Sequence, residues 1–522
     1  MRAAAKSAVR AKRPASAVRL EKRHMKLQEI LAGVQIASIA GAASLEIASI
    51  ECDSRKVSGG GIFFALRGAK LDGTQFVQDA LRRGAVAIAS ESARPADFPK
   101  ETVWVQLAPS TDRKALARAA ANFYGHPADA FQLVAVTGTN GKTTTTYLVD
   151  SILRAAGHTT GLIGTTGYRT PLGRRDAANT TPESLELQRI FAEIRHAGGT
   201  HATLEASSHA LAMDRLWGCH FAAAIFTNLT RDHLDYHQTF DAYFAAKRRL
   251  FEGTGAGAPD VAVINADDPY SAELHGLARR TLTYGLKSSA SLAPRKLALS
   301  PAGLEFTAQT PAGDVAVRSP LAGRMNAYNI LAAMGAAVAL GIRGEQIELG
   351  IARLSSVPGR FERIDQGQPF WVVVDYAHTD DALRNVISTA RDVSPAARIV
   401  TLFGAGGERD RTKRPLMGEA AGSLSDLVVL TSDNPRSEDP LRIINDVVVG
   451  LQRASAKYLI EPDREQAIAM ALDAAQPGDI VILAGKGHET YQVLRDGPID
   501  FDDREKARAI LRRKGYAKDA VR

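Results

Sequence analysis

The chain has 522 residues, of which 45% are hydrophobic, 23% charged and 6% aromatic, a composition typical of soluble globular proteins that excludes disordered, collagenous and disulfide-built chains. At roughly 100 to 200 residues per domain, this length predicts three domains. No apolar stretch reaches the ~20 residues of a membrane-spanning helix, and two cysteines, Cys52 and Cys219, are too few for a disulfide framework, so we expect a cytoplasmic protein in a reducing compartment.

The net charge of +8 belongs to the first 26 residues, which carry nine Lys and Arg side chains and one acid, Glu21. The remaining residues are formally neutral, so we expect no nucleic-acid-binding face on the folded body. The tail lacks the apolar core of a secretory signal, and we expect it to be disordered. It could be an electrostatic tether to RNA or lipid, or a segment without function produced by a start codon assigned upstream of Met25. We favour the second interpretation.

Residues 27–110 alternate short β-type runs with helical or Gly-rich stretches. The runs are 61–66, 85–88 and 103–105. This alternation predicts a small α/β domain.

Residues 111–357 form a second predicted domain. Its strands, 133–136, 223–226 and 261–264, are continuous apolar runs, as expected of parallel strands that are covered on both faces. Residues 133–157 read as a strand, a Gly-rich turn and a helix, in which Leu148, Ile152 and Leu153 share one face and Gly157 suits the C-terminal cap.

That strand, turn and helix predict a phosphate loop. Backbone N–H groups at the start of the helix, the Lys142 ammonium and the Thr143 hydroxyl would hold a polyphosphate and Mg²⁺. The strict pattern requires Gly where Val136 stands, and this chain has Gly138 instead. The loop residues expected to bind ATP are Gly138, Thr139, Asn140, Gly141, Lys142, Thr143 and Thr144.

Polar residues follow two further strands of this domain. Glu205 comes at the end of a β-type run, where its carboxylate could face the phosphates. After the strand at 223–226 come Asn228, Asp232, His233, Asp235 and His237. Each of these five residues alone is better explained as part of a surface loop, but the five together indicate a functional site. For Lys247, the residues alone favour an exposed helix face, because two further basic residues follow it.

Residues 358–522 repeat one pattern four times, an apolar strand followed by a polar cluster. The clusters are 375–378, 404–410, 431–436 and 485–489. Ligands of open α/β sheets bind beyond the carboxyl ends of the strands, so we expect these clusters to line one edge.

Eleven motifs together resemble the Mur ligases, the ATP-dependent amide-forming enzymes that build the peptide of peptidoglycan precursors. They are TGTNGKTT (137–144), NTTP (179–182), EASSH (205–209), FTNLTRDHLDYH (226–237), AAK ending at Lys247, LAGRMNAYN (321–329), PGRFE (358–362), DYAHT (375–379), GGERD (406–410), DNPR (433–436) and GKGHE (485–489). They occur in the family's order between residues 137 and 489, and we take the resemblance to cover essentially the whole chain after the tail.

The resemblance implies an α/β protein of three domains after the tail (1–26): a UDP-sugar-binding domain (27–110), a central P-loop ATPase with a mainly parallel sheet (111–357) and a C-terminal Rossmann-like domain that binds the amino acid (358–522). It implies that the chain is a monomer and uses ATP and Mg²⁺ to add meso-diaminopimelate to the D-glutamate of UDP-N-acetylmuramoyl-L-alanyl-D-glutamate through an acyl phosphate.

The resemblance also assigns residues to each ligand. In the family Lys247 would be carbamylated by CO₂, and the carbamate would bind Mg²⁺ together with Thr143, Glu205 and His233. The residues expected to be catalytic are Lys142, Glu205, His233 and Lys247. Outside the phosphate loop, the nucleotide would contact Asn326, Arg360, Asp375 and His378. The UDP-sugar and its dipeptide would contact Cys52, Ser54, Ala69, Lys70, Leu71, Asn179, Thr180, Thr181, Ser207, Met213 and Arg215.

Diaminopimelate would contact Arg409, Asp433, Asn434, Pro435, Arg436, Gly485 and Glu489. Meso-diaminopimelate differs from L-lysine by a second carboxylate, which an arginine can grip with two parallel hydrogen bonds. We therefore expect Arg436 to select diaminopimelate.

Three alternatives stay open at this point. One is an L-lysine-adding ligase of the same family. A second is folylpolyglutamate synthase, which has a similar phosphate loop and carbamylated lysine but lacks a uridine-binding domain, so that residues 27–110 argue against it. A third is a regulatory protein in which ATP only switches conformation, which would not need DNPR and GKGHE in a third domain.

Overall fold

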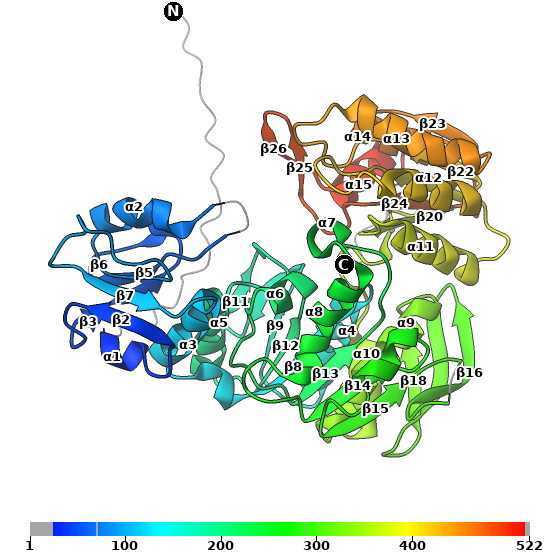
Figure 1. The fold of residues 1–522 in the computed structure, drawn as a ribbon. Helices are drawn as coiled ribbons and strands as arrows, with labels where there is room; N and C mark the ends of the chain where they lie inside the picture. Colours follow the sequence, from blue (N-terminus) through cyan, green and yellow to red (C-terminus); the bar gives the residue numbers. More distant parts are fainter. Residues whose placement is uncertain (1–23, 69–70, 288, 517–522) are drawn as a thin grey trace, which may run out of the picture. The chain divides into compact units, whose positions relative to one another are not determined.

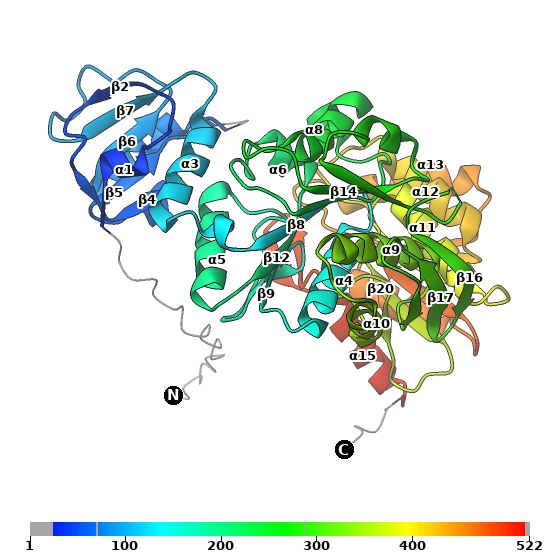
Figure 2. The same cartoon turned by 90° about the horizontal axis from the view of Figure 1, so that it is seen from below.

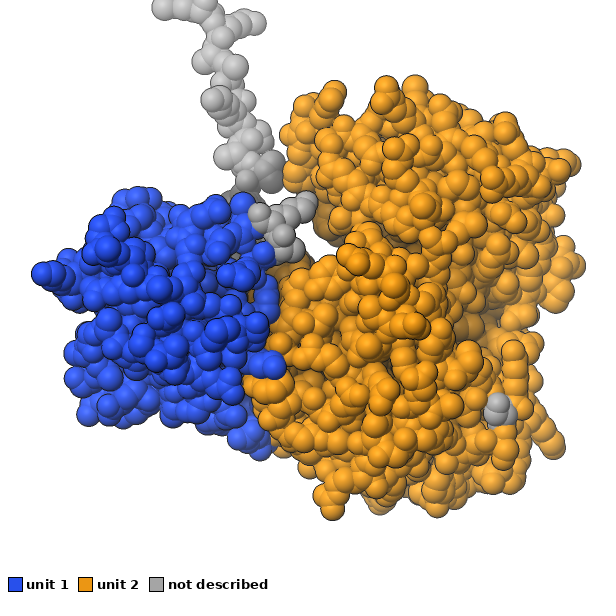
Figure 3. All heavy atoms as spheres, viewed as in Figure 1, with its two compact units in different colours: residues 1–130, 169–175, 184–199 blue, residues 131–168, 176–183, 200–522 orange. Residues whose placement is uncertain are grey.

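The structure, a computed structural model, describes residues 24–68, 71–287 and 289–516. It divides into two compact units (Figure 3): residues 1–130, 169–175 and 184–199 form the first, and residues 131–168, 176–183 and 200–522 the second. Ala69, Lys70 and the first 23 residues of the expected tail lie outside the described residues. Met25 and Lys26, which we also expected in the tail, instead form strand β1 and pair with β3 (Glu46–Ile47), which corrects the predicted end of the tail.

The first unit is built on the predicted small α/β domain (Figures 1 and 2). Its five-stranded sheet has the order β2-β7-β6-β5-β4 and is parallel except for β2. The strands are β2 (Ile36–Ala40), β4 (Ser49–Glu51), β5 (Gly61–Phe64), β6 (Ala85–Ser90) and β7 (Val103–Leu107), and the helices are α1 (Leu27–Ile30), α2 (Val77–Arg82), α3 (Asp112–Tyr124) and α5 (Ser184–His196).

Side chains of this sheet alternate between two cores, as the two-residue period of a strand requires. Ile62 and Phe64 pack with α1 and α3 on one face, whereas Phe63 packs with α2 on the other. The predicted division at residue 110 assigns α3 to the second domain, although α3 packs in the core of the first. The predicted domain limits otherwise stay a prediction.

The second unit contains the predicted parallel sheet of the central domain (Figure 1). Six of its strands run in the order β9-β12-β8-β13-β14-β15, with parallel pairing throughout. They are β8 (Gln132–Thr137), β9 (Thr160–Gly164), β12 (His201–Glu205), β13 (Ala223–Phe226), β14 (Val261–Asn265) and β15 (Arg280–Tyr284); the short strands β10 (Gly167–Thr170) and β11 (Gly173–Arg175) follow β9 in the chain.

Helices and a small antiparallel sheet complete this region. One face of the strands forms a large core with α4, α9 and the sheet β16-β17-β18. The elements are α4 (Lys142–Ala155), α6 (Ser208–Ala212), α7 (Leu234–His237), α8 (Phe240–Glu252), α9 (Arg324–Ala339), α10 (Gly344–Arg353), β16 (Ala293–Ser300), β17 (Gly303–Gln309) and β18 (Val315–Ser319). Leu148, Ile152 and Leu153 of α4 are all buried, and Gly157 follows with φ +89°, so both expectations for this helix are confirmed.

The C-terminal part of the second unit is a doubly wound sheet in the order β19-β20-β24-β21-β22-β23, parallel except for β19. Helices α11, α12 and α13 cover one face, and α14 and α15 the other. The elements are β19 (Glu362–Ile364), β20 (Trp371–Asp375), β21 (Ile399–Phe403), β22 (Leu427–Leu430), β23 (Tyr458–Ile460), β24 (Ile480–Ala484), the hairpin β25 (Tyr491–Leu494) and β26 (Gly497–Asp500), α11 (Asp380–Val393), α12 (Lys413–Leu424), α13 (Pro440–Arg453), α14 (Arg464–Asp473) and α15 (Asp503–Arg513).

The four predicted strands of this domain are therefore adjacent and parallel. Their polar clusters follow the same edge, as the sequence predicts. Across the described residues, we find no helix that combines the length and apolar character needed to cross a membrane.

Candidate functional site

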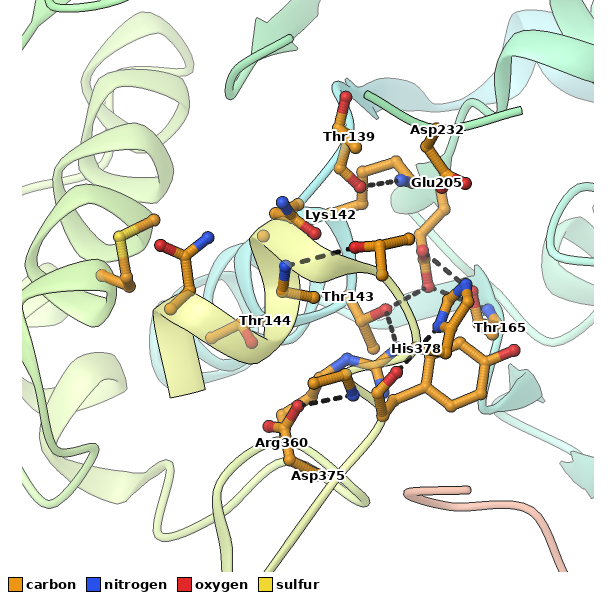
Figure 4. Close-up of a pocket in the computed structure, with 18 of the residues that line it drawn as sticks. Thr139, Lys142, Thr143, Thr144, Thr165, Glu205, Asp232, Arg360, Asp375 and His378 are labelled. Atoms are coloured by element: carbon orange, nitrogen blue, oxygen red, sulfur yellow. Dashed lines mark hydrogen bonds between the residues drawn. The ribbon is translucent and has the colours of Figure 1, made fainter. Parts of the chain in front are cut away.

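The predicted phosphate loop connects β8 to α4 (Figure 4). The Lys142 ammonium donates to the carbonyl oxygens of Gly138 (2.9 Å) and Thr139 (2.8 Å). Gly138 and Gly141 have φ +142° and +87°, and a Cβ on Gly138 would lie 1.9 Å from the Thr227 hydroxyl oxygen. Only glycine fits there, which explains why the glycine of this loop stands at 138. Helix α4 begins at the loop, so its first N–H groups and its positive end are available to an anion.

Glu205 lies beside the loop because β12 pairs in parallel with β8, with Glu205 opposite Val136. Its side chain is 1% exposed. The carboxylate accepts hydrogen bonds from the Thr143 hydroxyl (3.0 Å), the Thr165 backbone N–H (2.8 Å) and the Thr165 hydroxyl (3.0 Å). A carboxylate is thus fixed next to the threonine expected to bind Mg²⁺.

Lys247 is buried beside the same loop, with 1% of its surface exposed. Its ammonium nitrogen donates to Gly138 O (2.7 Å) and lies 4.3 Å from the centre of the Tyr243 ring. Burial and the nearby Lys142 hold the pKa of Lys247 well below its ordinary value. The exposed helix face that the residues alone favoured is therefore wrong.

The burial of Lys247 could have been predicted from the sequence. In α8 the buried side chains include Tyr243, Lys247 and Phe251, which are four residues apart and so share one face of a helix. Lys247 stands within the apolar stripe, whereas its basic neighbour Arg248 pairs with Glu252 at the surface (3.0 Å).

The polar cluster after β13 divides into three roles. Asp232 and His233 line the cavity described below, with His233 Nε2 3.3 Å from Asp232 Oδ2. Asn228 holds the phosphate loop, because its side chain accepts from the Asn140 N–H (2.9 Å) and donates to Asn140 O (3.2 Å). Asp235 is exposed and His237 contacts the Ser208 hydroxyl (3.0 Å); neither lines the cavity.

One cavity of about 270 Å³ brings most of these side chains together. Expected residues that line it are Thr139, Asn140, Gly141, Lys142, Thr143, Thr144, Thr180, Glu205, Ser207, His233, Lys247, Asn326, Arg360, Asp375 and His378. They come from segments far apart in sequence, and Figure 4 labels ten of the lining residues, from Thr139 to His378. The lining also includes Thr165, Tyr243, Asn329 and Tyr376, which the sequence reasoning did not single out.

Arg360 connects the C-terminal domain to the phosphate loop. Its guanidinium donates to the Thr143 hydroxyl (3.1 Å) and lies 4.8 Å from the centre of the Tyr376 ring. At the end of β20, the Asp375 carboxylate accepts from the N–H groups of Phe361 (2.7 Å) and Ala377 (2.9 Å). Burial nevertheless raises the pKa of Asp375.

His378 and Asn326 complete the expected nucleotide contacts. His378 Nδ1 lies 2.8 Å from Tyr376 O, and burial together with the nearby Lys413 lowers the pKa of His378. Asn326 donates to Ala322 O (2.7 Å) and accepts from the Asn329 amide (3.1 Å). Both side chains are fixed at the cavity wall by these contacts.

The residues expected to hold the dipeptide lie at the Glu205 side of the cavity. The Thr181 hydroxyl donates to Glu205 O (2.5 Å), and Arg215 donates to Thr181 O (2.8 Å). Thr180 and Thr165 contact through their hydroxyls (3.0 Å). The other three expected residues accept hydrogen bonds from neighbouring side chains. The Tyr168 hydroxyl donates to Asn179 O (2.6 Å), the Arg215 guanidinium to the Met213 sulfur (3.7 Å), and the Thr181 hydroxyl to the Ser207 hydroxyl (3.2 Å).

The residues expected to contact the UDP group belong to the first unit. Cys52 is partly buried after β4, Ser54 is buried, and Leu71 is 57% exposed. Ala69 and Lys70 lie outside the described residues.

The residues expected to bind the diamino acid follow β22 and β24. Asn434 donates to the Glu489 carboxylate (3.1 Å), and Arg436, with φ +56°, donates to Gly407 O (2.6 Å). A Cβ on Gly406 would meet both Arg436 (3.4 Å) and Arg409 (3.7 Å), so both arginines lie beside this glycine. Gly485 faces Asp433, whose carboxylate carbon is 3.9 Å from a Cβ placed there; Pro435 is buried between Asn434 and Arg436.

The edge of the C-terminal sheet that carries these residues adjoins the cavity through the GKGHE segment (485–489). His488 Nε2 lies 3.1 Å from Thr165 O, and Thr165 is the residue that donates twice to Glu205. A Cβ on Gly359 would lie 2.2 Å from His488 N, so glycine at 359 permits this approach. The predicted amino-acid site and the predicted phosphate site are neighbours.

Oxygen atoms dominate the expected metal site. The Thr143 hydroxyl and the Glu205 carboxylate are hard ligands of the kind that Mg²⁺ prefers, and they are 3.0 Å apart. Among the described residues, no group of three His, Cys, Asp or Glu side chains is spaced to hold a metal ion. A hydroxyl and a modified lysine are not among those residue types, so the expected set is compatible with this finding.

Three family descriptions match the chain. Residues 46–124 match "Mur ligase family, catalytic domain", residues 136–337 match "Mur ligase middle domain", and residues 359–487 match "Mur ligase, glutamate ligase domain". These matches follow the chain in the order of the three predicted domains.

The chain is also similar to individual proteins. It is 54% identical over 495 residues to UDP-N-acetylmuramoyl-L-alanyl-D-glutamate–2,6-diaminopimelate ligase of Solibacter usitatus, with 94% of this chain and 99% of that one covered. A solved structure of a ligase with the same name is 35% identical, covers 95% of this chain and 100% of its own, and gives a TM-score of 0.64. Folylpolyglutamate synthase of Mycobacterium tuberculosis shares the fold, at 18% identity and a TM-score of 0.57, over 77% of this chain and 95% of its own.

Proposed function

Because the chain belongs to the Mur ligase family, we propose that it is the ligase that uses ATP to add meso-2,6-diaminopimelate to the D-glutamate of UDP-N-acetylmuramoyl-L-alanyl-D-glutamate. The observation that carries the proposal is the shared cavity: the phosphate loop, a buried carboxylate and the expected dipeptide residues Thr180 and Ser207 line one space. A carboxylate substrate and a nucleotide phosphate bound there would be neighbours. We include in the proposal a monomeric enzyme in the cytoplasm.

The reaction needs activation of a carboxylate, because its oxygen is a poor leaving group. A side-chain oxygen of the D-glutamate would attack the γ-phosphorus of ATP, and the bond from that phosphorus to ADP would break, which gives an acyl phosphate. The amine of the diamino acid would then attack the acyl carbon and displace phosphate, with loss of a proton from nitrogen. Phosphoryl transfer of this kind depends on positioning and charge neutralisation.

The side chains around the phosphate loop suit that demand. The Lys142 ammonium can exchange its two carbonyl acceptors for phosphate oxygens, and α4 directs its N–H groups to the same place. Arg360 adds a second cation beside Thr143. Burial lowers the pKa of Lys142, against the opposing effect of Glu205 and Asp232, so a bound polyphosphate would favour its charged form.

Mg²⁺, when bound, would neutralise phosphate charge, and Thr143 and Glu205 would hold it together with His233 and Lys247 as its carbamate. Carbamylation is supported by the surroundings of Lys247. Only a neutral amine can attack CO₂, and the low pKa of Lys247 supplies one. The carbamate would place a negative charge near the Lys142 ammonium, and this cation would stabilise it.

Two related activities are less well supported. Folylpolyglutamate synthase is similar to 77% of this chain, whereas residues 46–124 match a further Mur ligase domain. An L-lysine-adding ligase would not require Arg436 at the strand edge.

The proposal is tested by measuring phosphate release: we expect release that requires ATP, UDP-N-acetylmuramoyl-L-alanyl-D-glutamate and diaminopimelate together. Release that is independent of the diamino acid would indicate an ATP-driven switch and would refute the proposal.

A further inference from the structure

The edge of the C-terminal sheet contains a buried cation to which no role has been given so far. Lys486 lies between Gly485 and Glu489 in sequence and is 0% exposed. Its ammonium donates to Glu489 Oε2 (3.1 Å) and to Asn434 Oδ1 (3.1 Å), and it lies 3.6 Å from Asp433 Oδ1. Two of the three hydrogens of the ammonium are used in these hydrogen bonds, and its charge pairs with Asp433 without a hydrogen bond to Oδ1.

We propose that Lys486 is a positioning residue for the diamino acid: it fixes Asp433, Asn434 and Glu489 in place and offsets one of the two carboxylate charges, so that the remaining charge matches a single substrate ammonium. This inference rests on the proposed function and deepens it, because it concerns how the same site selects its amino acid.

The geometry explains why Lys486 would act through its neighbours. The side chain has no exposed surface and its donors face protein acceptors, so the substrate cannot reach it. Asp433, Asn434 and Glu489, in contrast, belong to the two segments that follow β22 and β24, and Lys486 contacts all three, in addition to the direct hydrogen bond from Asn434 to Glu489. Without it, Asp433 and Glu489 would face each other across a buried space, where like charges repel strongly.

The surrounding contacts leave a place for a substrate ammonium. Among the described residues, Asp433 Oδ1 is buried and has no hydrogen-bond partner, although a buried acceptor is normally satisfied. The Asp433 backbone is held by Gln492, which donates to its carbonyl oxygen (2.7 Å). A fixed carboxylate oxygen with free capacity is what an ammonium ligand requires.

The strand ends themselves are rigidly held. Arg464 is buried and donates to Ser432 O (3.2 Å) and Ala484 O (2.9 Å), the residues just before Asp433 and Gly485. Its guanidinium also pairs with the buried Asp503 (2.7 Å). The backbone would therefore persist without Lys486, and the loss of the lysine should act mainly on the acidic side chains.

Charge offset has a consequence for selectivity. The distal end of diaminopimelate carries one ammonium and one carboxylate, whereas that of lysine carries an ammonium alone. Removal of the Lys486 charge makes the site more negative, which disfavours the extra carboxylate of diaminopimelate and favours the lone ammonium of lysine.

The test is Lys486→Met, which keeps the apolar stem and removes the charge. We expect KM for diaminopimelate to rise about tenfold or more, as for a lost interaction with a buried charge. KM for ATP and the affinity for ADP should stay within about twofold of wild type, and the diaminopimelate-to-lysine ratio of kcat/KM should fall. In a double-mutant cycle, Glu489→Gln should cost less in the Lys486→Met background than in wild type.

The chain offers a matched control in the same domain. Lys506 pairs with Glu465 (2.5 Å) and lies 5.4 Å from the centre of the Phe501 ring, much as Lys486 pairs with Glu489 and lies 5.7 Å from that of Tyr491. Lys506→Met should leave all these constants unchanged.

Two results would overturn the inference. The first is a folded Lys486→Met protein whose KM for diaminopimelate and selectivity match wild type. The second is an equal loss of ADP affinity, which would mean a general structural role for the lysine. If the wild type itself fails to use diaminopimelate, the proposed function is refuted, and the assignment of Lys486 to that substrate with it.

Discussion

Two lysines converge on one carbonyl oxygen in the candidate site. Lys142 and Lys247 both donate to Gly138 O, at 2.9 and 2.7 Å, although they come from different helices. Burial, and after it the repulsion from Lys142, lowers the pKa of Lys247. Bound phosphate for Lys142 and a carbamate on Lys247 would each resolve this conflict, so the two residues have distinct predicted roles.

Lys142→Ala should reduce ligase turnover at least 100-fold, because the phosphate charge would lose its nearest cation in a site where electrostatic stabilisation dominates. The measurement is phosphate release by the folded variant. Arg154→Ala, which changes an exposed residue at the other end of α4, is the control and should keep wild-type turnover. Retention of more than a few per cent of wild-type activity by Lys142→Ala would disprove the phosphate-loop assignment.

Lys247→Ala should be nearly inactive, and added short-chain carboxylates should partly restore it, because a free acid can occupy the place of the carbamate. Rescue is measured as turnover against carboxylate concentration, with Arg248→Ala as an active control on the surface of the same helix. An intact mass that shows only unmodified lysine at saturating CO₂ would count against the carbamate, and a fully active Lys247→Ala enzyme would exclude it.

Arg436 is the residue expected to distinguish diaminopimelate from lysine. Loss of its guanidinium should lower kcat/KM for diaminopimelate by on the order of 10²-fold or more, while lysine, which lacks the second carboxylate, changes little. Arg436→Lys should rescue poorly, because an ammonium cannot form two parallel hydrogen bonds. The exposed Arg453 at the end of α13 provides an inert arginine-to-alanine control. Selectivity that survives the loss of Arg436 would contradict this assignment.

At the scale of whole elements, the sequence was most informative where one segment carries the full signal. The strand, glycine turn and helix at 133–157 need no distant partner to be identified, and the structure places Leu148, Ile152 and Leu153 on the buried face as predicted. The parallel strands were also predictable, because a run that is apolar at every position requires cover on both faces.

Contacts between distant segments were not predictable in the same way. Thr165 donates to Glu205 from the end of β9, and Asn140 donates to Asp381 of α11 at 2.6 Å. Both depend on which strands become neighbours and on how the C-terminal domain meets the phosphate loop, and no local periodicity encodes either. Lys486 was missed for the related reason that its partners Asn434 and Asp433 lie more than fifty positions earlier.

The first sheet contains an acidic residue in an unfavourable place, at the end of β4. Burial raises the pKa of Glu51 to about 7, although Lys56 and Arg189 act in the opposite direction. In the unfolded chain this carboxyl titrates near its ordinary value. Between these two pKa values the folded state binds more protons than the unfolded state, so the contribution of Glu51 to stability falls as pH rises from about 4.5 to 7 and is constant above that range.

Glu51→Gln should therefore stabilise the first unit at pH 8, by at most about 3 kcal/mol, and have little effect at pH 4.5. The measurement is thermal unfolding of both proteins at the two pH values. The exposed Glu29 of α1 offers a control substitution, Glu29→Gln, with no pH-dependent difference expected. Equal effects of Glu51→Gln at the two pH values would show that Glu51 is not held in its protonated form.

At the scale of the whole molecule, the net positive charge and the residues assigned to ligands lie in different parts of the chain. The net charge of +8 belongs to the first 26 residues, whereas each residue assigned to a ligand here lies beyond them. The residues assigned to the UDP group are in the first unit, and those assigned to the dipeptide, ATP and the diamino acid are in the second. Separate residue sets for three ligands on one chain are what an amide ligase with two substrates and a nucleotide requires.

The most direct test of the account is the mass of the product. The full chain is incubated with ATP, Mg²⁺ and UDP-N-acetylmuramoyl-L-alanyl-D-glutamate, together with meso-diaminopimelate and L-lysine in equal amounts. We predict a product that contains one diaminopimelate residue joined with loss of water, formed together with one ADP and one phosphate. A product that contains lysine in comparable amount, or ATP consumption without any amide product, would contradict the proposed function.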